Sequence, residues 1–291
     1  MTEVELELDE YAKEQYIIGC HYINAMQEDN QKAIPFYIEA AINGLAIAQY
    51  KLGECYENGI GVNIDNEEAF KWYKAAALQD FVLAQFKLVK CYYNGRGVNK
   101  SNEIAIEWCT KAAWLGYDVA QNHLGYCYSE GIGVYRDDKE AIRWYIEAAH
   151  HGQAGAQYNL GVCYQLGKGV EADLTIAIMW FERAANQGLA QAQFHLGDCY
   201  YCGDGVEKDY DVAIVWYEKA ANQGYAQAQY KLGCYYCDNV EMSDIAIDWY
   251  ERAAKQGHCD AQYALGAYYE RLGEYSKAMK WYKISAVNNL L

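Results

Sequence analysis

A phrase of about 36 residues returns along this chain of 291 residues, and that repetition constrains its fold more than any other feature. Related phrases begin at Ala48, Ala84, Ala120, Ala156, Ala192, Ala228 and Ala261, and a degenerate first copy begins near Glu14. A fixed period of this length indicates a stack of small units, because each unit buries its apolar face only against its neighbours. The sequence therefore predicts about eight copies that form one continuous solenoid over residues 14–291, after an acidic tail at residues 1–13.

Each copy contains the pattern of a first helix. In the copy that begins at Ala48, the apolar residues Ala48, Leu52, Cys55 and Tyr56 lie at i, i+4, i+7 and i+8. That spacing places them on one face of an α-helix. Gly59 then predicts the end of this helix, since a helix end followed by a tight turn favours a residue that tolerates positive φ.

A second helix follows each turn. Asp65 is a predicted N-cap, and Glu68 three residues later completes the sequence of a capping box. Equivalent caps are Ser101, Asp137, Asp173 and Asp209. The predicted helix ends are Gly44, Asp80, Gly116, Gly152, Gly188, Gly224 and Gly257.

Tryptophan recurs at one position of the second helix. The column consists of Trp72, Trp108, Trp144, Trp180, Trp216, Trp249 and Trp281, with Phe36 in the first copy. Paired alanines lie beside it in the sequence, and small residues let helices approach while a large ring fills the space opposite. The column is therefore predicted to be core, and only Trp114 lies outside it.

The full pattern, A-x-x-x-L-G-x-x-Y-x-x-G-x-G-V-x-x-D-x-x-x-A-x-x-W-Y-x-x-A-A-x-x-G, resembles the Sel-1-like repeat, a relative of the tetratricopeptide repeat. The resemblance covers residues 14–291. It implies an all-α, right-handed solenoid of stacked helix pairs. It also implies a non-enzymatic adaptor or scaffold that holds a protein or peptide in the concave groove. The first and last copies are atypical, and so is the shortened turn at residues 237–240.

Charge narrows the class of partner. Lys and Arg sum to 24 and Asp and Glu to 40, which gives a formal charge of −16. A nucleic-acid partner is disfavoured, since phosphate binding needs a basic surplus. No run approaches the length of apolar residues that spans a membrane, and no N-terminal signal is seen. We expect a cytoplasmic protein with no cofactor and a partner of basic or mixed charge.

Eight of the eleven cysteines fall into two groups that share Cys199. Cys55, Cys91, Cys127, Cys163 and Cys199 form one column on the first helix, where a row of small buried hydrophobic side chains is expected. Cys199, Cys202, Cys234 and Cys237 form two C-x-x-C pairs, with His195 one turn before Cys199. These residue types ligate zinc, so a metal-binding module stays an alternative, although the spacing between the pairs is long for a zinc ribbon.

A partner surface is predicted by analogy with tetratricopeptide repeats, whose first helices line the concave face. The predicted contacts are Tyr50, Glu54, Asn58, Phe86, Lys90, Tyr93, Asn94, Tyr126, Tyr158, Phe194, Asp198, Tyr201 and Tyr230. A plain solvated face, or aromatic packing between copies, explains parts of the same pattern. A second alternative function is a hydrolase, because a β-lactamase-like activity is attributed to cysteine-rich relatives, but no nucleophile and base pair is evident here.

Overall fold

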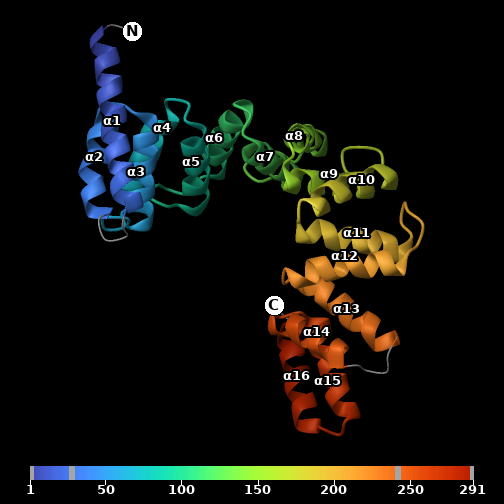
Figure 1. Cartoon of the computed structure of the whole chain (residues 1–291). Helices are drawn as coiled ribbons and strands as arrows, with labels where there is room; N and C mark the ends of the chain where they lie inside the picture. The colour runs from blue at the N-terminus through green and yellow to red at the C-terminus, as the bar shows by residue number, and fades with distance from the viewer. Residues whose placement is uncertain (1–2, 26–29, 240–243, 289–291) are drawn as a thin grey trace. The chain divides into compact units, whose positions relative to one another are not determined.

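The computed structural model describes residues 3–25, 30–239 and 244–288, and these contain sixteen α-helices and no β-strand (Figure 1). The helices form consecutive antiparallel hairpins, which confirms the predicted all-α repeat fold. The chain divides into two compact units, Met1–His151 and Gly152–Leu291, called unit 1 and unit 2 below.

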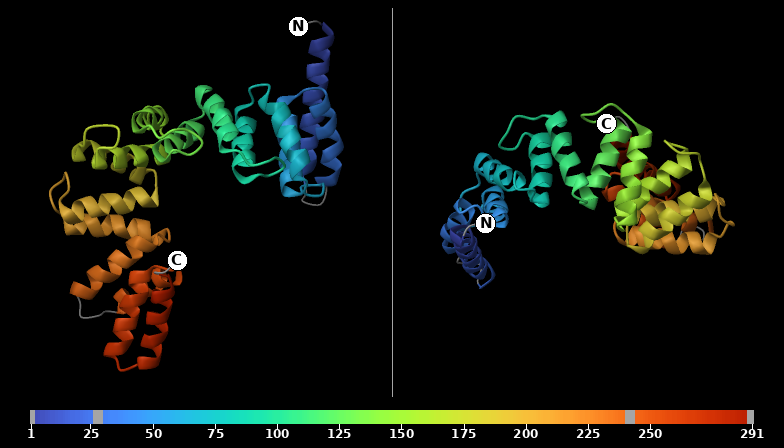
Figure 2. Two further views of the ribbon diagram at one scale, coloured as in Figure 1. Left: turned by 180° about the vertical axis from the view of Figure 1, so that it is seen from behind. Right: turned by 90° about the horizontal axis from the view of Figure 1, so that it is seen from above.

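Within each unit, every helix packs against the next one along the chain, as the further views also show (Figure 2). Unit 1 contains α1 (Glu3–Ala25), α2 (Asn30–Ile42), α3 (Ala46–Asn58), α4 (Asn66–Ala77), α5 (Val82–Asn94), α6 (Asn102–Trp114), α7 (Asp118–Glu130) and α8 (Asp138–His150). Unit 2 contains α9 (Ala154–Leu166), α10 (Leu174–Asn186), α11 (Ala190–Cys202), α12 (Tyr210–Asn222), α13 (Ala226–Asn239), α14 (Asp244–Lys255), α15 (Cys259–Arg271) and α16 (Tyr275–Asn288).

The predicted caps define the hairpin turns. The Asp65 side chain accepts hydrogen bonds from the backbone N–H groups of Glu67 and Glu68, and the other predicted caps act likewise. The reciprocal half of the capping box is absent at this turn. The backbone N–H of Asp65 donates instead to the Tyr56 carbonyl, and the Glu68 carboxylate pairs with Lys71.

Helix ends adopt the predicted left-handed backbone. Gly59 has φ of 70°, and Asp80, which replaces the glycine found in other copies, has φ of 60°. One other expectation needs adjustment, because residues 3–13, predicted as a tail, belong to α1. Pro35, the only proline of the sequence, lies inside α2. Of the shortened turn predicted at residues 237–240, residues 237–239 belong to α13. Residue 240 and residues 26–29 of the atypical first copy lie outside the described residues.

A glycine on the first helix meets an aromatic ring on the second helix in nearly every hairpin. A Cβ atom added to Gly53 would lie 2.6 Å from the Tyr73 ring, which is too close for any real side chain. The same contact joins Gly125 to Tyr145, Gly161 to Phe181, Gly197 to Tyr217, Gly233 to Tyr250 and Gly266 to Tyr282. The two helices of a hairpin therefore approach as closely as a bare backbone permits.

One hairpin reverses this arrangement. In the hairpin of α5 and α6, Val89 occupies the glycine position and Cys109 occupies the aromatic position, and both are buried. The larger residue on one helix is matched by the smaller residue on the other, so the volume of the contact is conserved. The Cys109 thiol also donates to the Ala120 carbonyl at 3.3 Å.

The tryptophan column flanks this core. Trp108, Trp144 and Trp180 are 6–8% exposed, whereas Trp72, Trp216, Trp249 and Trp281 are only half-buried. Four of these rings are covered by a cation from three residues further along the helix. The pairs are Lys111 on Trp108, Arg183 on Trp180, Lys219 on Trp216 and Arg252 on Trp249, at 3.6–4.6 Å from the ring centroid.

A column of buried glutamines ties successive hairpins together. The side-chain amide of each donates to an alanine carbonyl on the second helix of the preceding hairpin, at 3.0–3.3 Å for Gln49, Gln85, Gln121, Gln193, Gln229 and Gln262. Where a second glutamine stands thirty residues further on, it donates to the remaining oxygen, as Gln79 does to Gln49 at 2.8 Å. Each such pair satisfies groups that are costly to bury alone.

We predict that substitutions at Val89 and Cys109 are energetically coupled. Cys109→Tyr alone should destabilise the protein by about 1–3 kcal/mol through overpacking against Val89. Val89→Gly alone should cost a similar amount through a cavity and a flexible helix position. The double variant restores the contact of the other hairpins, so a double-mutant cycle in urea should show favourable coupling of at least about 1 kcal/mol. Additive losses would contradict this explanation.

Candidate partner-binding surface

The predicted contacts lie on the first helices of the hairpins, on α3, α5 and α7 in unit 1 and on α9, α11 and α13 in unit 2. We call these faces the first-helix surface of each unit. Four of the thirteen predicted residues are exposed there, namely Asn58, Lys90, Asn94 and Tyr126. Tyr50 is buried, and the other eight are half-buried.

The exposed residues differ in what they do. The Asn58 and Asn94 amides donate to the carbonyls of Glu54 and Lys90, one helical turn earlier, so both satisfy groups at a helix end. Lys90 on α5 extends over the Phe86 ring, 5.4 Å from its centroid. Tyr126 occupies the equivalent position on α7 and is 46% exposed. Lys90 and Tyr126 are therefore the predicted residues most available to a partner.

The predicted aromatic column packs against rings of its own hairpin and of the next copy, and the second contact is the alternative that the sequence left open. The Tyr50 ring contacts Tyr73 and Phe81, with centroids 5.8 and 5.3 Å away. In unit 2, Phe194 contacts Tyr217 and Tyr225 in the same way. These rings lie beneath the exposed residues and support the first-helix surface.

An acid–lysine network links adjacent first helices in unit 1. Lys87 on α5 pairs with Glu57 on α3 at 2.5 Å and lies 3.7 Å from Glu54. The buried Tyr73 hydroxyl donates to the same Glu57 carboxylate at 2.6 Å. Burial acts to raise the pKa of Glu57, but the hydrogen bonds from Lys87 and Tyr73 outweigh it and lower that pKa. Glu57 is thus held as a carboxylate by two partners.

Unit 2 repeats the network with the acid moved by one helical turn. Tyr217, the equivalent of Tyr73, donates to Asp198 at 2.6 Å, and Lys231, the equivalent of Lys87, lies 3.6 Å from Asp198. Burial and the bond to Asp198 raise the pKa of the Tyr217 hydroxyl. Asp198, predicted as a partner contact, is therefore already engaged inside the protein.

Sequence reasoning missed the bridging column that contains Lys87 and Lys231. Its members are Lys51, Lys87, His123, Asn159, His195 and Lys231, one residue after the aromatic column. The signal was present, because basic residues recur there in a strongly acidic chain. Its meaning depended on knowing which neighbouring helix each side chain faces.

The two histidines of that column have different partners. His195 Nε2 lies 3.0 Å from the Tyr158 hydroxyl, whereas His123 Nε2 is buried without a hydrogen-bond partner among the described residues. The cause is one missing hydroxyl group, because Phe86 occupies the position that Tyr158 occupies in unit 2. Burial lowers the pKa of both imidazoles, so both are neutral in the folded protein near neutral pH.

All eleven cysteines are free thiols. The five members of the predicted column are buried, as expected, and burial raises the pKa of Cys55 and Cys91 to about 11 and that of Cys199 to about 12. Cys202 is exposed. Within residues 3–25, 30–239 and 244–288, no three His, Cys, Asp or Glu side chains are placed to hold a metal ion, the C-x-x-C pairs included.

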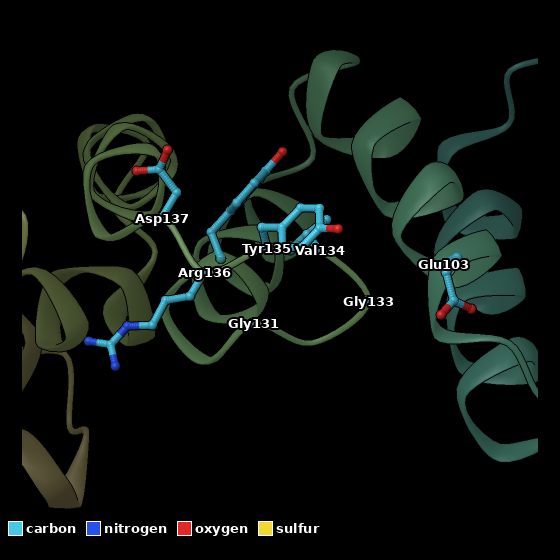
Figure 3. Close-up of a pocket in the computed structure, with 8 residues that line it drawn as sticks. Glu103, Gly131, Gly133, Val134, Tyr135, Arg136 and Asp137 are labelled. Atoms are coloured by element: carbon cyan, nitrogen blue, oxygen red, sulfur yellow. The ribbon is translucent and has the colours of Figure 1, made fainter.

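A hollow of about 880 Å³ lies at the turn between α7 and α8. Figure 3 shows Glu103 across the hollow from this turn, with Arg136 and Asp137 directed away from Glu103. Its charged groups already have partners. Ser101 donates to Glu103, Asp137 caps α8, and Arg136 pairs with Asp138 at 3.0 Å. The hollow is therefore a feature of the turn, and the acidic and basic side chains that line it are all hydrogen-bonded or ion-paired.

We predict that Phe86→Tyr stabilises the protein by about 1 kcal/mol, because its hydroxyl would satisfy His123 Nε2. Tyr158→Phe should destabilise by a similar amount. Both imidazoles have a folded-state pKa below the unfolded value of about 6.5. The stabilisation that comes from burying them in the neutral form is therefore complete above that pH, and it is lost as the pH falls below it. Urea unfolding between pH 7.5 and pH 5 measures both effects, and equal midpoints for the two variants would contradict the assignment.

We also predict selective alkylation of the thiols. At pH 8 in the native state, iodoacetamide should modify Cys202 first, because thiolate content and access govern the rate. The five column cysteines should react only after unfolding. Mass spectrometry of digested protein gives the order, with Cys202→Ser as the control that removes the fast site. Early modification of Cys55 or Cys199 would show that the column is not core.

None of the helices within the described residues combines the length and the apolar character needed to cross a membrane.

The sequence matches no functionally curated protein. The model of the Sel1 repeat matches eight segments, residues 46–81, 82–117, 118–153, 154–189, 190–225, 226–239, 243–258 and 259–286.

Two solved structures are similar over most of the chain. A protective antigen of uropathogenic Escherichia coli strains with an SLR fold is 37% identical, with a TM-score of 0.82, over 95% of this chain and 61% of that protein. This chain thus spans less than two thirds of that relative. A Sel1 repeat protein from Oxalobacter formigenes is 35% identical, with a TM-score of 0.75, over 83% of this chain and 99% of that protein. The repeat matches and these likenesses agree with the hairpins, and the chain belongs to the Sel1 repeat family.

Proposed function

We propose that this protein is a non-enzymatic scaffold that binds a protein or peptide along the first-helix surface, the face expected to be concave. Sel1 repeat proteins are generally protein-interaction scaffolds. The observation that carries the proposal is the pair Lys90 and Tyr126, equivalent residues on α5 and α7 that vary in type and face solvent above an internally paired frame.

The residues beneath Lys90 and Tyr126 support partner binding because their polar groups already have hydrogen-bond or ion-pair partners. Glu57, Lys87 and Tyr73 pair among themselves, and Phe86 and Tyr50 pack against neighbouring rings. A partner that contacts Lys90 and Tyr126 therefore meets a preformed surface, which lowers the entropy lost on binding. Tyr is well suited to such contacts, since it offers a rigid ring and a hydroxyl.

We propose a partner of basic or mixed charge, on the strength of the −16 formal charge. Long-range attraction of this kind speeds encounter and is screened by salt. Capture should therefore weaken as the salt concentration rises.

No observation favours the two alternatives. A thiol nucleophile needs a lowered pKa beside a basic imidazole. Here burial raises the pKa of Cys199 to about 12 and lowers that of His195, the reverse of an activated pair. The zinc module needs ligands that converge, and the described residues contain no such group.

The test compares two matched double variants in a pull-down from native lysate. Lys90→Ala with Tyr126→Ala should reduce capture of the specific partner by about tenfold or more, as expected when two central contacts are lost. Lys100→Ala with Tyr135→Ala makes the same chemical changes at exposed turn positions and should leave capture unchanged. Both variants should melt like the parent protein. Equal capture by the two variants would show that the first-helix surface is not the binding face.

A further inference from the structure

A second cavity lies in unit 1, between the end of α6, the buried side of α7 and the middle of α8. Its volume is about 220 Å³. That is smaller than the pockets of about 300–1,000 Å³ that hold drug-sized ligands, and much larger than one water, at about 30 Å³. Six side chains that line it are Trp114, Gln121, Glu140, Arg143, Trp144 and Glu147.

Two buried polar atoms of the lining have no hydrogen-bond partner among the described residues. They are Gln121 Oε1 and Trp144 Nε1, in side chains whose residues are 4% and 7% exposed. One is an acceptor and the other a donor. A buried polar group without a partner is costly, so a pair of them at one cavity favours the binding of a polar group there.

The sequence explains the unpartnered Gln121 oxygen. In unit 2, Gln187 donates to Gln157 at 2.8 Å and Gln223 donates to Gln193 at 2.7 Å. The equivalent donor for Gln121 would be residue 151, which is an exposed histidine. The hairpin of α7 and α8 therefore lacks the glutamine that donates to the equivalent side-chain oxygen in unit 2.

The tryptophan of this copy also lacks its cation. Lys111, Arg183, Lys219 and Arg252 each cover the tryptophan three residues before them. On α8 that position is Glu147, and the described residues place no Lys or Arg over the Trp144 ring. A carboxylate stands where four other copies supply a positive charge.

The charges of the lining favour a cation. Arg143 pairs with Glu140 at 2.7 Å, whereas the Glu147 carboxylate has no ion-pair partner within the described part of the chain. Trp114, the one tryptophan outside the repeating column, is 73% exposed and meets Trp144 edge to face, with centroids 5.2 Å apart. Exposed aromatic faces beside a carboxylate attract cations.

We propose that this cavity binds an arginine side chain of a peptide or protein ligand. The guanidinium lies against the tryptophans, as Arg183 lies on Trp180 within the chain, and donates to Gln121 Oε1 and to Glu147. An adjacent peptide carbonyl accepts from Trp144 Nε1. Arginine is favoured over lysine because its planar fork stacks on a ring and donates several hydrogen bonds at once.

The assay uses a single-residue probe, so it does not rest on the first-helix surface or on any natural partner. N-acetyl-arginine N-methylamide is titrated into the full-length protein and followed by NMR of the tryptophan indole N–H groups. Its size suggests a Kd on the order of 1 mM. The citrulline analogue, which is neutral and has nearly the same shape, and the lysine analogue should each bind at least about fivefold more weakly.

Two variants fill the site from within the chain. Glu147→Arg supplies the cation found in other copies, and His151→Gln supplies the missing donor to Gln121. Each should weaken the arginine probe by about fivefold or more while the melting temperature stays equal or rises. Glu171→Arg, at an exposed turn, makes the same charge change as the first variant and should have no effect.

The outcomes are decisive in either direction. Arginine-selective binding that both filling variants weaken supports the proposal. No binding at 20 mM probe (about twentyfold above the expected Kd), equal binding of the citrulline analogue, or no effect of the filling variants overturns it. A crystal structure with only water between Gln121 and Trp144, in the presence of saturating probe, would overturn it as well.

Discussion

The contact between a backbone glycine and an aromatic ring sets the spacing of each hairpin, and much of the structure depends on it. At Gly53, Gly125 and Gly197 the opposing ring lies where a Cβ atom would be. This close approach brings the two helices near enough for paired alanines to fill the rest of the interface. The exchange to Val89 and Cys109 shows that the volume of the contact, rather than either residue type, is what the fold requires.

The buried glutamines act at the next level, because they join one hairpin to the next instead of closing a single hairpin. Each amide donates across the junction to an alanine carbonyl, and the pairing of its oxygen depends on a residue thirty positions away. The same framework therefore has satisfied and unsatisfied copies. The oxygens of Gln85 and Gln121 both lack a partner among the described residues, and at Gln121 this coincides with a cavity that Trp114 and Glu147 also line.

Most of the fold could be predicted from the sequence, because helix faces, Asp caps and terminal glycines are local signals that recur with the period. Asp65 and Gly59 are examples where the residue type alone determines the conformation. The site was less predictable. Tyr50 and Asp198 share columns with exposed residues, yet one is buried and the other is paired with Tyr217. Such outcomes depend on side chains from two different copies, and sequence columns do not show which of them meet.

The four buried polar atoms without a partner among the described residues belong to Gln85, Gln121, His123 and Trp144. They all lie within α5, α7 and α8, so these unpartnered atoms gather over one stretch of unit 1. In a linear array each repeat is held only by its neighbours, and a local deficit is not shared across the whole molecule. We expect local opening to be easier in this stretch than in repeats whose buried polar atoms are all paired. The part of the chain best equipped to take up a ligand is also the part whose rigidity a ligand would change most.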